Sequence, residues 1–117
     1  MLNKTEYLLT CLAEECAEVQ QLISKCVRFG FENYNPHDKD KRTNYEELKR
    51  ELDDIDALRW MLQAESNKNF AHADSMTLSP KIAKVLRYMD VSRECGTLDP
   101  EVQNTSATPK PRSELSI

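Results

Sequence analysis

Apolar residues recur every three or four positions between about Thr5 and Phe29, which is the spacing of one face of an α-helix. On a helical wheel that advances about 100° per residue, the apolar positions fall within about 60° of Glu15. These positions are Leu8, Leu12, Val19, Leu22 and Cys26. The pattern predicts one long helix, with Thr5 as its N-cap and Gly30 ending it in a left-handed conformation.

A second helical pattern runs from about Asn44 to Glu65, with Thr43 or Asn44 as its cap. Its apolar positions fall within about 60° of Glu51 and are Leu48, Ile55, Leu58 and Leu62. The polar connection between the two helices, Phe31–Thr43, is long for a compact bundle. Long connections are often functional, and a lid over a site is one interpretation of this one.

The third segment is shorter. Ser79 and Pro80 provide an N-cap and a first helical residue, so the pattern predicts a helix over Lys81–Met89 that extends toward Cys95. From Gly96 onward, Thr, Ser, Pro and isolated charges offer little apolar surface to bury. We therefore predict one helical domain over residues 1–95 and a flexible C-terminal tail over residues 96–117.

Acidic side chains interrupt both long apolar stripes in the same way. Glu15 and Glu18 project from the first stripe, and Glu51 and Asp54 have the same angular relation to the second. Buried carboxylates are costly when isolated, and neighbouring ones repel each other, but a cation resolves both problems. If the two helices pack antiparallel by these faces, four carboxylates converge on one inner site.

Carboxylates without nearby Cys or His are hard oxygen ligands, which favour Mg²⁺, with Mn²⁺ as the other candidate. Because Mg²⁺ keeps several waters and commonly bridges carboxylates to phosphates, the pattern points to a phosphorylated substrate. A single E-x-x-E motif is usually a solvated helix face, and a looser bundle without a metal site is the alternative interpretation. Two such pairs, both set in apolar stripes, favour the metal site.

Several side chains are candidates for binding that substrate. Lys25 and Tyr7 lie on the helical line of Glu18, where they could contact a phosphate and a base. Further candidates are Arg28 in the last turn of the first helix and, on the third, Lys84, Arg87 and Tyr88. The cations among them are also consistent with solvated surface charges. Trp60 points away from Glu51, which indicates packing against another helix or a second subunit.

The composition limits the class of protein. With 117 residues, 31% of them charged, and two glycines, the chain fits one helical domain. A net charge of −4 argues against a nucleic-acid polymer as partner. The N-terminal residues lack the pattern of a signal peptide, and no apolar run has membrane-spanning length, so we expect a cytoplasmic protein with no membrane partner. Cysteines on or near the first apolar face are expected to be small buried hydrophobes: Cys11, Cys16 and Cys26.

The two acidic motifs resemble those of the MazG-like all-α nucleoside triphosphate pyrophosphohydrolases. The family signature is E-E-x-x-E followed on the next long helix by E-x-x-D, and here it reads Glu14–Glu18 and Glu51–Asp54. Lys25–Gly30 also looks like the end of that helix in small members. The resemblance covers about residues 5–90. The paired motif is moderately specific, and the Phe31–Thr43 insertion departs from the family spacing, so loop contacts do not transfer.

The resemblance implies a function. Glu15, Glu18, Glu51 and Asp54 would hold Mg²⁺, with Glu14 assisting in the activation of water and Glu15 taking part in catalysis. The substrate would be a nucleoside triphosphate and the products a nucleoside monophosphate and pyrophosphate. Family members are helical dimers or tetramers, so a homodimer or homotetramer is expected. The alternative is a non-catalytic helical module that binds a nucleotide or supports assembly.

Overall fold

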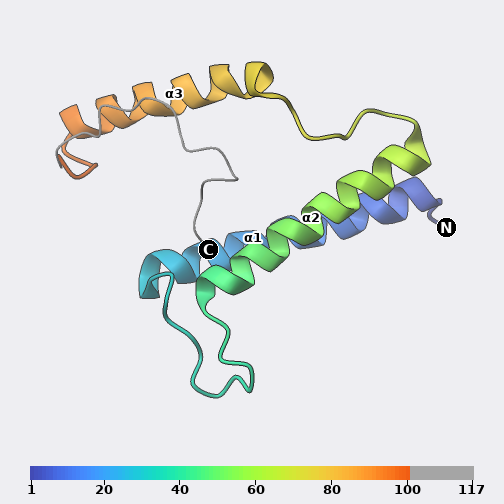
Figure 1. Cartoon of the computed structure of the whole chain (residues 1–117), viewed down its shortest axis with the longest axis horizontal. Coiled ribbons are helices and arrows are strands. Elements are labelled where there is room, and N and C mark those ends of the chain that lie inside the picture. The colour runs from blue at the N-terminus through green and yellow to red at the C-terminus, as the bar shows by residue number, and fades with distance from the viewer. Residues whose placement is uncertain (101–117) are drawn as a thin grey trace. The chain divides into compact units, whose positions relative to one another are not determined.

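The computed structural model of the chain describes residues 1–100, and within them it is entirely helical, with three helices and no strand (Figure 1). The helices are α1 (Lys4–Phe29), α2 (Asn44–Ser66) and α3 (Ser75–Glu94). The predicted all-α class is therefore confirmed. The chain divides into a first compact unit, Met1–Ala71, and a second that begins at His72. From residue 101 onward, the predicted flexible tail lies outside the described residues.

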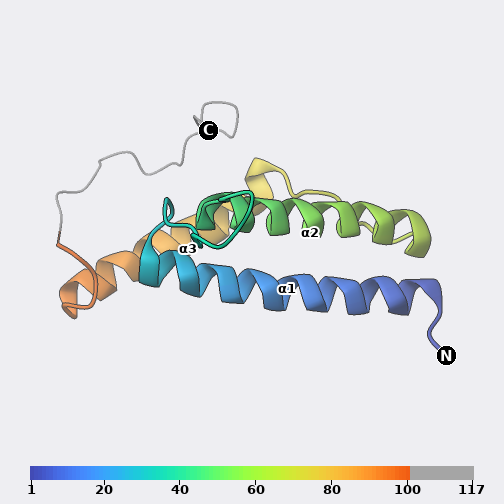
Figure 2. The same cartoon turned by 90° about the horizontal axis from the view of Figure 1, so that it is seen from below.

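The first unit is an antiparallel pair formed by α1 and α2, which lie side by side in both views (Figures 1 and 2). At 1.5 Å per residue these helices are about 39 and 35 Å long. The predicted stripes form the contact: Leu22 is 7% exposed and Leu62 is fully buried. The remaining stripe positions are half-buried, namely Leu8, Leu12, Val19, Cys26, Leu48, Ile55 and Leu58. The pairing of the two stripes is thus confirmed.

The start of α1 differs from the prediction. Asn3, not Thr5, is the N-cap: its side chain accepts a hydrogen bond from the backbone N–H of Glu6 at 2.8 Å. The Glu6 carboxylate accepts one in return from the backbone N–H of Asn3 at 3.3 Å. This reciprocal arrangement satisfies two helix-end donors, which Thr5 would not do. Gly30 ends the helix, as predicted, but with φ 90° and ψ 161°, an extended glycine conformation rather than a left-handed helical one.

The start of α2 is as predicted. The Thr43 hydroxyl accepts a hydrogen bond from the backbone N–H of Glu46 at 3.1 Å, so Thr43 is the N-cap. The next residue, Asn44, is buried and donates from its side chain to the carbonyl of Gly30 at 3.0 Å. This hydrogen bond links the first turn of α2 to Gly30, the first residue after α1. The two ends of the connection are therefore held together at the end of the helical pair.

The start of α3 is a correction to the sequence prediction. Asp74 is the N-cap and accepts a hydrogen bond from the backbone N–H of Thr77 at 2.8 Å, which also lowers the pKa of Asp74. Ser79 and Pro80 consequently lie inside the helix, although the dipeptide is typical of a helix start. Proline lacks an N–H, so the helix forgoes the bond to the carbonyl of Met76. The Asp74 cap outcompetes the start at Ser79.

The cysteines test one further expectation. All four cysteines are free; Cys11 and Cys26 are half-buried, but Cys16 is exposed, which corrects the expectation for that residue. Cys16 follows Glu15 and is therefore about 100° off the centre of the stripe. None of the three helices carries an apolar stretch long enough to cross a bilayer.

Candidate metal centre

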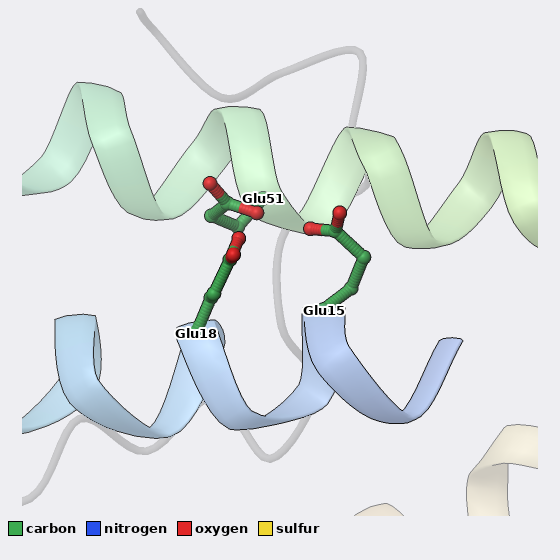
Figure 3. A group of neighbouring side chains, drawn as sticks. All are labelled: Glu15, Glu18 and Glu51. Carbon is green, nitrogen blue, oxygen red and sulfur yellow. The ribbon is translucent and has the colours of Figure 1, made fainter. Parts of the chain in front are cut away.

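Three carboxylates meet between α1 and α2. Glu15 and Glu18 point from α1, and Glu51 points from α2, into the space between the helices (Figure 3). One carboxylate oxygen of each lies within 4.8 Å of the others. The spacing i, i+3 places the two α1 residues one turn apart on the same face. Antiparallel pairing of the stripes then brings Glu51 opposite them.

The cluster is shielded from water on one side and open on the other. Glu15 and Glu51 are half-buried, whereas Glu18 is exposed. One oxygen of each half-buried residue, Glu15 Oε2 and Glu51 Oε2, is removed from solvent and has no hydrogen-bond partner. A buried polar atom left without a partner costs about 1–3 kcal/mol, and more when it is charged. A proton or a cation held between the carboxylates offsets that cost.

The neighbouring carboxyl groups of the cluster raise the pKa of Glu51. The neighbouring Glu15 carboxyl favours the protonated, hydrogen-bonding form of Glu51, burial adds to this effect, and Glu18 contributes next. Together they raise the pKa of Glu51 from 4.5 to about 8. Near neutral pH, the metal-free site therefore holds a proton on this carboxyl. That proton partly relieves the repulsion among the three acids.

Among residues 1–100, no lysine or arginine forms an ion pair with Glu15, Glu18 or Glu51. The ion pairs of this part of the chain include Arg42 with Asp40, Lys49 with Asp53 and Arg93 with Asp90. An arrangement of hard oxygen donors, with two buried oxygens lacking partners and no countercharge, fits a divalent cation such as Mg²⁺. The residues present therefore fit the ion that the sequence predicts.

Two predicted site residues lie beside this group rather than within it. Asp54 is exposed and is not among the three residues whose oxygens converge. It sits about 60° from the centre of the α2 stripe, and its side chain is one methylene shorter than that of glutamate. Glu14, adjacent to Glu15, is also exposed. The roles of Asp54 as a ligand and Glu14 in catalysis stay predictions.

The three predicted substrate-binding residues of α1 have different surroundings. Lys25 lines a cavity near the end of the helix. The Arg28 guanidinium lies over the ring of Phe29, 5.0 Å from its centroid. Tyr7 lies in an apolar groove with Trp60 at the other end of the helical pair. The structure thus separates Lys25 and Tyr7 to opposite sides of the carboxylates along the pair.

The other three predicted substrate-binding residues, Lys84, Arg87 and Tyr88, belong to α3 in the second unit. Within that unit, Lys84 and Tyr88 line a shallow hollow closed by Thr97 and Leu98, and Arg87 does not. The positions of the two units relative to each other are not determined. The participation of these three side chains in the metal centre stays a prediction.

Sequence analysis missed the cavity that Lys25 lines. This cavity, of about 540 Å³, lies between the end of α1 and the connection, with Tyr34 and Arg42 in its wall. The available signal was the density of asparagine and aromatic residues directly after Gly30. That signal is ambiguous, because Asn and Pro also commonly mark turns.

Comparison with known proteins adds no relative: no family model, no curated protein and no solved structure matches this chain.

Proposed function

We propose that the chain is a Mg²⁺-dependent nucleoside triphosphate pyrophosphohydrolase, which converts an ordinary or modified nucleoside triphosphate and water into a nucleoside monophosphate and pyrophosphate. The observation that carries this proposal is the convergence of Glu15, Glu18 and Glu51 from two helices, with two buried oxygens lacking partners. The resemblance of the paired motifs to the MazG-like family supports the choice of reaction.

Each carboxylate has a role in this proposal. Glu15, Glu18 and Glu51 hold Mg²⁺, and Asp54, at the edge of the same face of α2, is the fourth candidate ligand. When bound, the ion neutralises charge on the triphosphate and lowers the pKa of coordinated water. Glu14, the exposed neighbour of Glu15, is the proposed acceptor of the proton of the attacking water. The reaction breaks the bond between the α-phosphorus and the oxygen that bridges it to the β-phosphate.

The proton on Glu51 links the reaction to pH. Because the pKa of Glu51 is raised to about 8, the metal-free protein must release this proton before Glu51 can act as a charged ligand. Cation binding is therefore expected to tighten as the pH rises toward 8.

We also propose that the protein works as a homodimer or homotetramer. Within the described chain, Leu22 and Leu62 are the only buried large apolar side chains, and only Leu62 is fully buried. Large apolar side chains remain exposed on the pair. Val27 on α1 is 81% exposed, Trp60 on α2 is 76% exposed, and Ile23, one turn before Val27, is 47% exposed. An exposed apolar surface of this kind is typical of a subunit contact.

Release of pyrophosphate from a panel of nucleoside triphosphates, with and without Mg²⁺, tests the proposed function. The wild-type chain should release pyrophosphate from at least one substrate only when the cation is present. Glu51→Gln should abolish turnover while retaining helical circular dichroism. Asp53→Asn is a matched control, because Asp53 is exposed on α2 and pairs with Lys49 outside the cluster. Nucleotide binding without pyrophosphate release would favour the non-catalytic module instead.

A further inference from the structure

The cavity at the connected end of the helical pair lies within about two helical turns of the carboxylate cluster. Glu47, in its wall, precedes Glu51 by one helical turn, and Lys25 follows Glu18 by two turns. At 1.5 Å per residue, the cavity wall is therefore about 6 to 11 Å along the pair from the carboxylates. A ligand whose phosphates lie at the cluster can extend directly into this cavity.

The walls of the cavity are held in place by backbone hydrogen bonds between the connection and the first turn of α2. The N–H of Asn44 donates to the carbonyl of Asn33 at 2.9 Å, and the N–H of Tyr45 donates to the carbonyl of Phe31 at 3.0 Å. The rings of Phe31 and Tyr45 also meet edge to face, with centroids 6.0 Å apart. A site held in this way requires little ordering when a ligand binds.

These bonds argue against a phosphate in the cavity itself. The amides at the start of a helix are a common anion site, but here those of Asn44 and Tyr45 are already bonded to carbonyls of the connection. Two acids, Asp38 and Glu47, also line the cavity and offset the charges of Lys25 and Arg42. The chemistry of the lining therefore suits an uncharged group.

The lining offers both a stacking surface and hydrogen-bonding groups. Tyr34 is 42% exposed and its ring contacts no other aromatic ring in residues 1–100. The side-chain amide of Asn33 makes no hydrogen bond within the same residues, so both its donor and its acceptor are free. Asn35 uses only its oxygen, which accepts from the N–H of His37 at 2.9 Å. Aromatic rings and amides together are typical of sites that bind nucleobases.

We propose that this cavity binds the base and sugar of the nucleoside triphosphate, with Tyr34 stacking on the base and Asn33 bonding to its edge. Lys25, which forms no ion pair within residues 1–100, lies between the cavity and the cluster and contacts the phosphate nearest the sugar. This assignment rests on the proposed function. It makes the connection a specificity element of the same site.

The groove at the opposite end of the pair is the competing location. Trp60 and Tyr7 could also stack on a base, but the groove is mainly apolar and lies farther from Glu51. On α2 the groove begins at Trp60, nine residues or about 14 Å beyond Glu51, whereas the cavity reaches Glu47, four residues or about 6 Å away. On α1, Leu8 of the groove and Lys25 of the cavity are each seven residues from the nearest carboxylate of the cluster. The cavity beside the connection is closer to Glu51 and has the amides that base recognition requires.

The test is isothermal titration of the full-length chain in Mg²⁺ with two kinds of probe. The first is a set of α,β-methylene nucleoside triphosphates, which carry a base and resist cleavage between the α- and β-phosphates. The second is inorganic tripolyphosphate, which has no base. The variants are Tyr34→Ala, Tyr34→Phe, Asn33→Ala and, at the competing groove, Trp60→Ala, each checked by circular dichroism.

Tyr34→Ala should weaken binding of the preferred analogue about tenfold, as expected for loss of one stacked base, and leave tripolyphosphate binding unchanged. Tyr34→Phe should retain affinity because it retains the ring, and Asn33→Ala should change the ranking of the bases. Trp60→Ala should have no effect on either probe.

Wild-type affinity for the analogues in both Tyr34→Ala and Asn33→Ala, or a loss confined to Trp60→Ala, would overturn the assignment of the cavity. The proposed function would survive that result if the wild-type chain still bound and cleaved a triphosphate. Equal weakening of tripolyphosphate would show that the cavity binds phosphate, which also contradicts the assignment. A wild-type chain that bound neither probe would overturn both proposals.

Discussion

Replacing Glu51 with glutamine removes the ionisable group at the centre of the carboxylate cluster while preserving the length and shape of the side chain. In the metal-free protein, Glu51 has a raised pKa of about 8 because it faces Glu15 and Glu18 and is partly buried. The glutamine resembles its protonated form. The substitution should therefore change how the stability of the fold depends on pH, separately from any effect on catalysis.

The direction and size of this effect follow from proton linkage. Between pH 4.5 and about 8, folded Glu51 holds a proton that the unfolded chain has released, so the wild type loses stability as the pH rises through this window. The full shift in the pKa of Glu51 corresponds to at most about 5 kcal/mol in the free energy of unfolding. Glu18 is exposed and Glu51 only half-buried, so screening by solvent reduces the expected loss to about 1–3 kcal/mol.

Urea unfolding in a chelator at pH 5, 7 and 9 measures this quantity. The free energy of unfolding of the wild type should fall relative to that of Glu51→Gln between pH 5 and pH 9. At pH 9 the variant should be the more stable protein by about 1–3 kcal/mol. Asp53→Asn should follow the wild-type profile. Parallel profiles for wild type and Glu51→Gln would refute the claim that the carboxylates repel one another in the folded state.

Three further predictions follow from the same geometry. Addition of Mg²⁺ at pH 7 should stabilise the wild type and release a proton, and titration calorimetry in buffers of different ionisation enthalpy measures the proton release. Glu51→Gln should show neither effect. Equal stabilisation of both proteins would exclude Glu51 as a ligand. Leu62→Ala should lower the free energy of unfolding by about 2–5 kcal/mol in urea, because Leu62 is fully buried between α1 and α2; a loss below about 1 kcal/mol would contradict that packing. Val27→Asp should shift the mass measured by light scattering after size exclusion toward 13.5 kDa, the mass of one chain. A wild-type protein already at that mass at micromolar concentration would exclude the proposed oligomer.

The helical pair could be predicted from sequence because its signal is periodic. Glu15 and Glu51 mark the centres of two apolar stripes, and Leu22 and Leu62 in those stripes are the most buried apolar residues of the described chain. A stripe fixes which face of a helix is buried, and two long stripes joined by one connection leave few ways to pair. The convergence of Glu15, Glu18 and Glu51 follows from that pairing.

Local competition explains the errors at helix ends. Asn3 and Thr5 are both acceptable caps, and the choice depends on whether Glu6 can return a hydrogen bond, which only the three-dimensional arrangement decides. Ser79 and Pro80 have the composition of a helix start, but Asp74 caps the helix earlier, and the helix tolerates one missing hydrogen bond at proline.

Contacts within the connection were beyond sequence reasoning for a different reason. No periodicity constrains Phe31–Thr43, so the hydrogen bonds that Asn33 and Phe31 accept from the first turn of α2 could not be anticipated. The cavity formed by this folding consequently had no sequence signal beyond its asparagine and aromatic content. Similarly, the raised pKa of Glu51 depends on distances to Glu15 and Glu18 that a helical wheel does not give.

The central claim is that the carboxylate cluster supports cleavage of a nucleoside triphosphate between its α- and β-phosphates. Its most direct test is simultaneous measurement of pyrophosphate and nucleoside monophosphate from a triphosphate panel, comparing wild type with Glu51→Gln and Asp53→Asn. The account predicts equal amounts of the two products, formed only with Mg²⁺ or Mn²⁺, by the wild type and Asp53→Asn but not by Glu51→Gln. Release of inorganic phosphate and a nucleoside diphosphate, or undiminished turnover by Glu51→Gln, would contradict it.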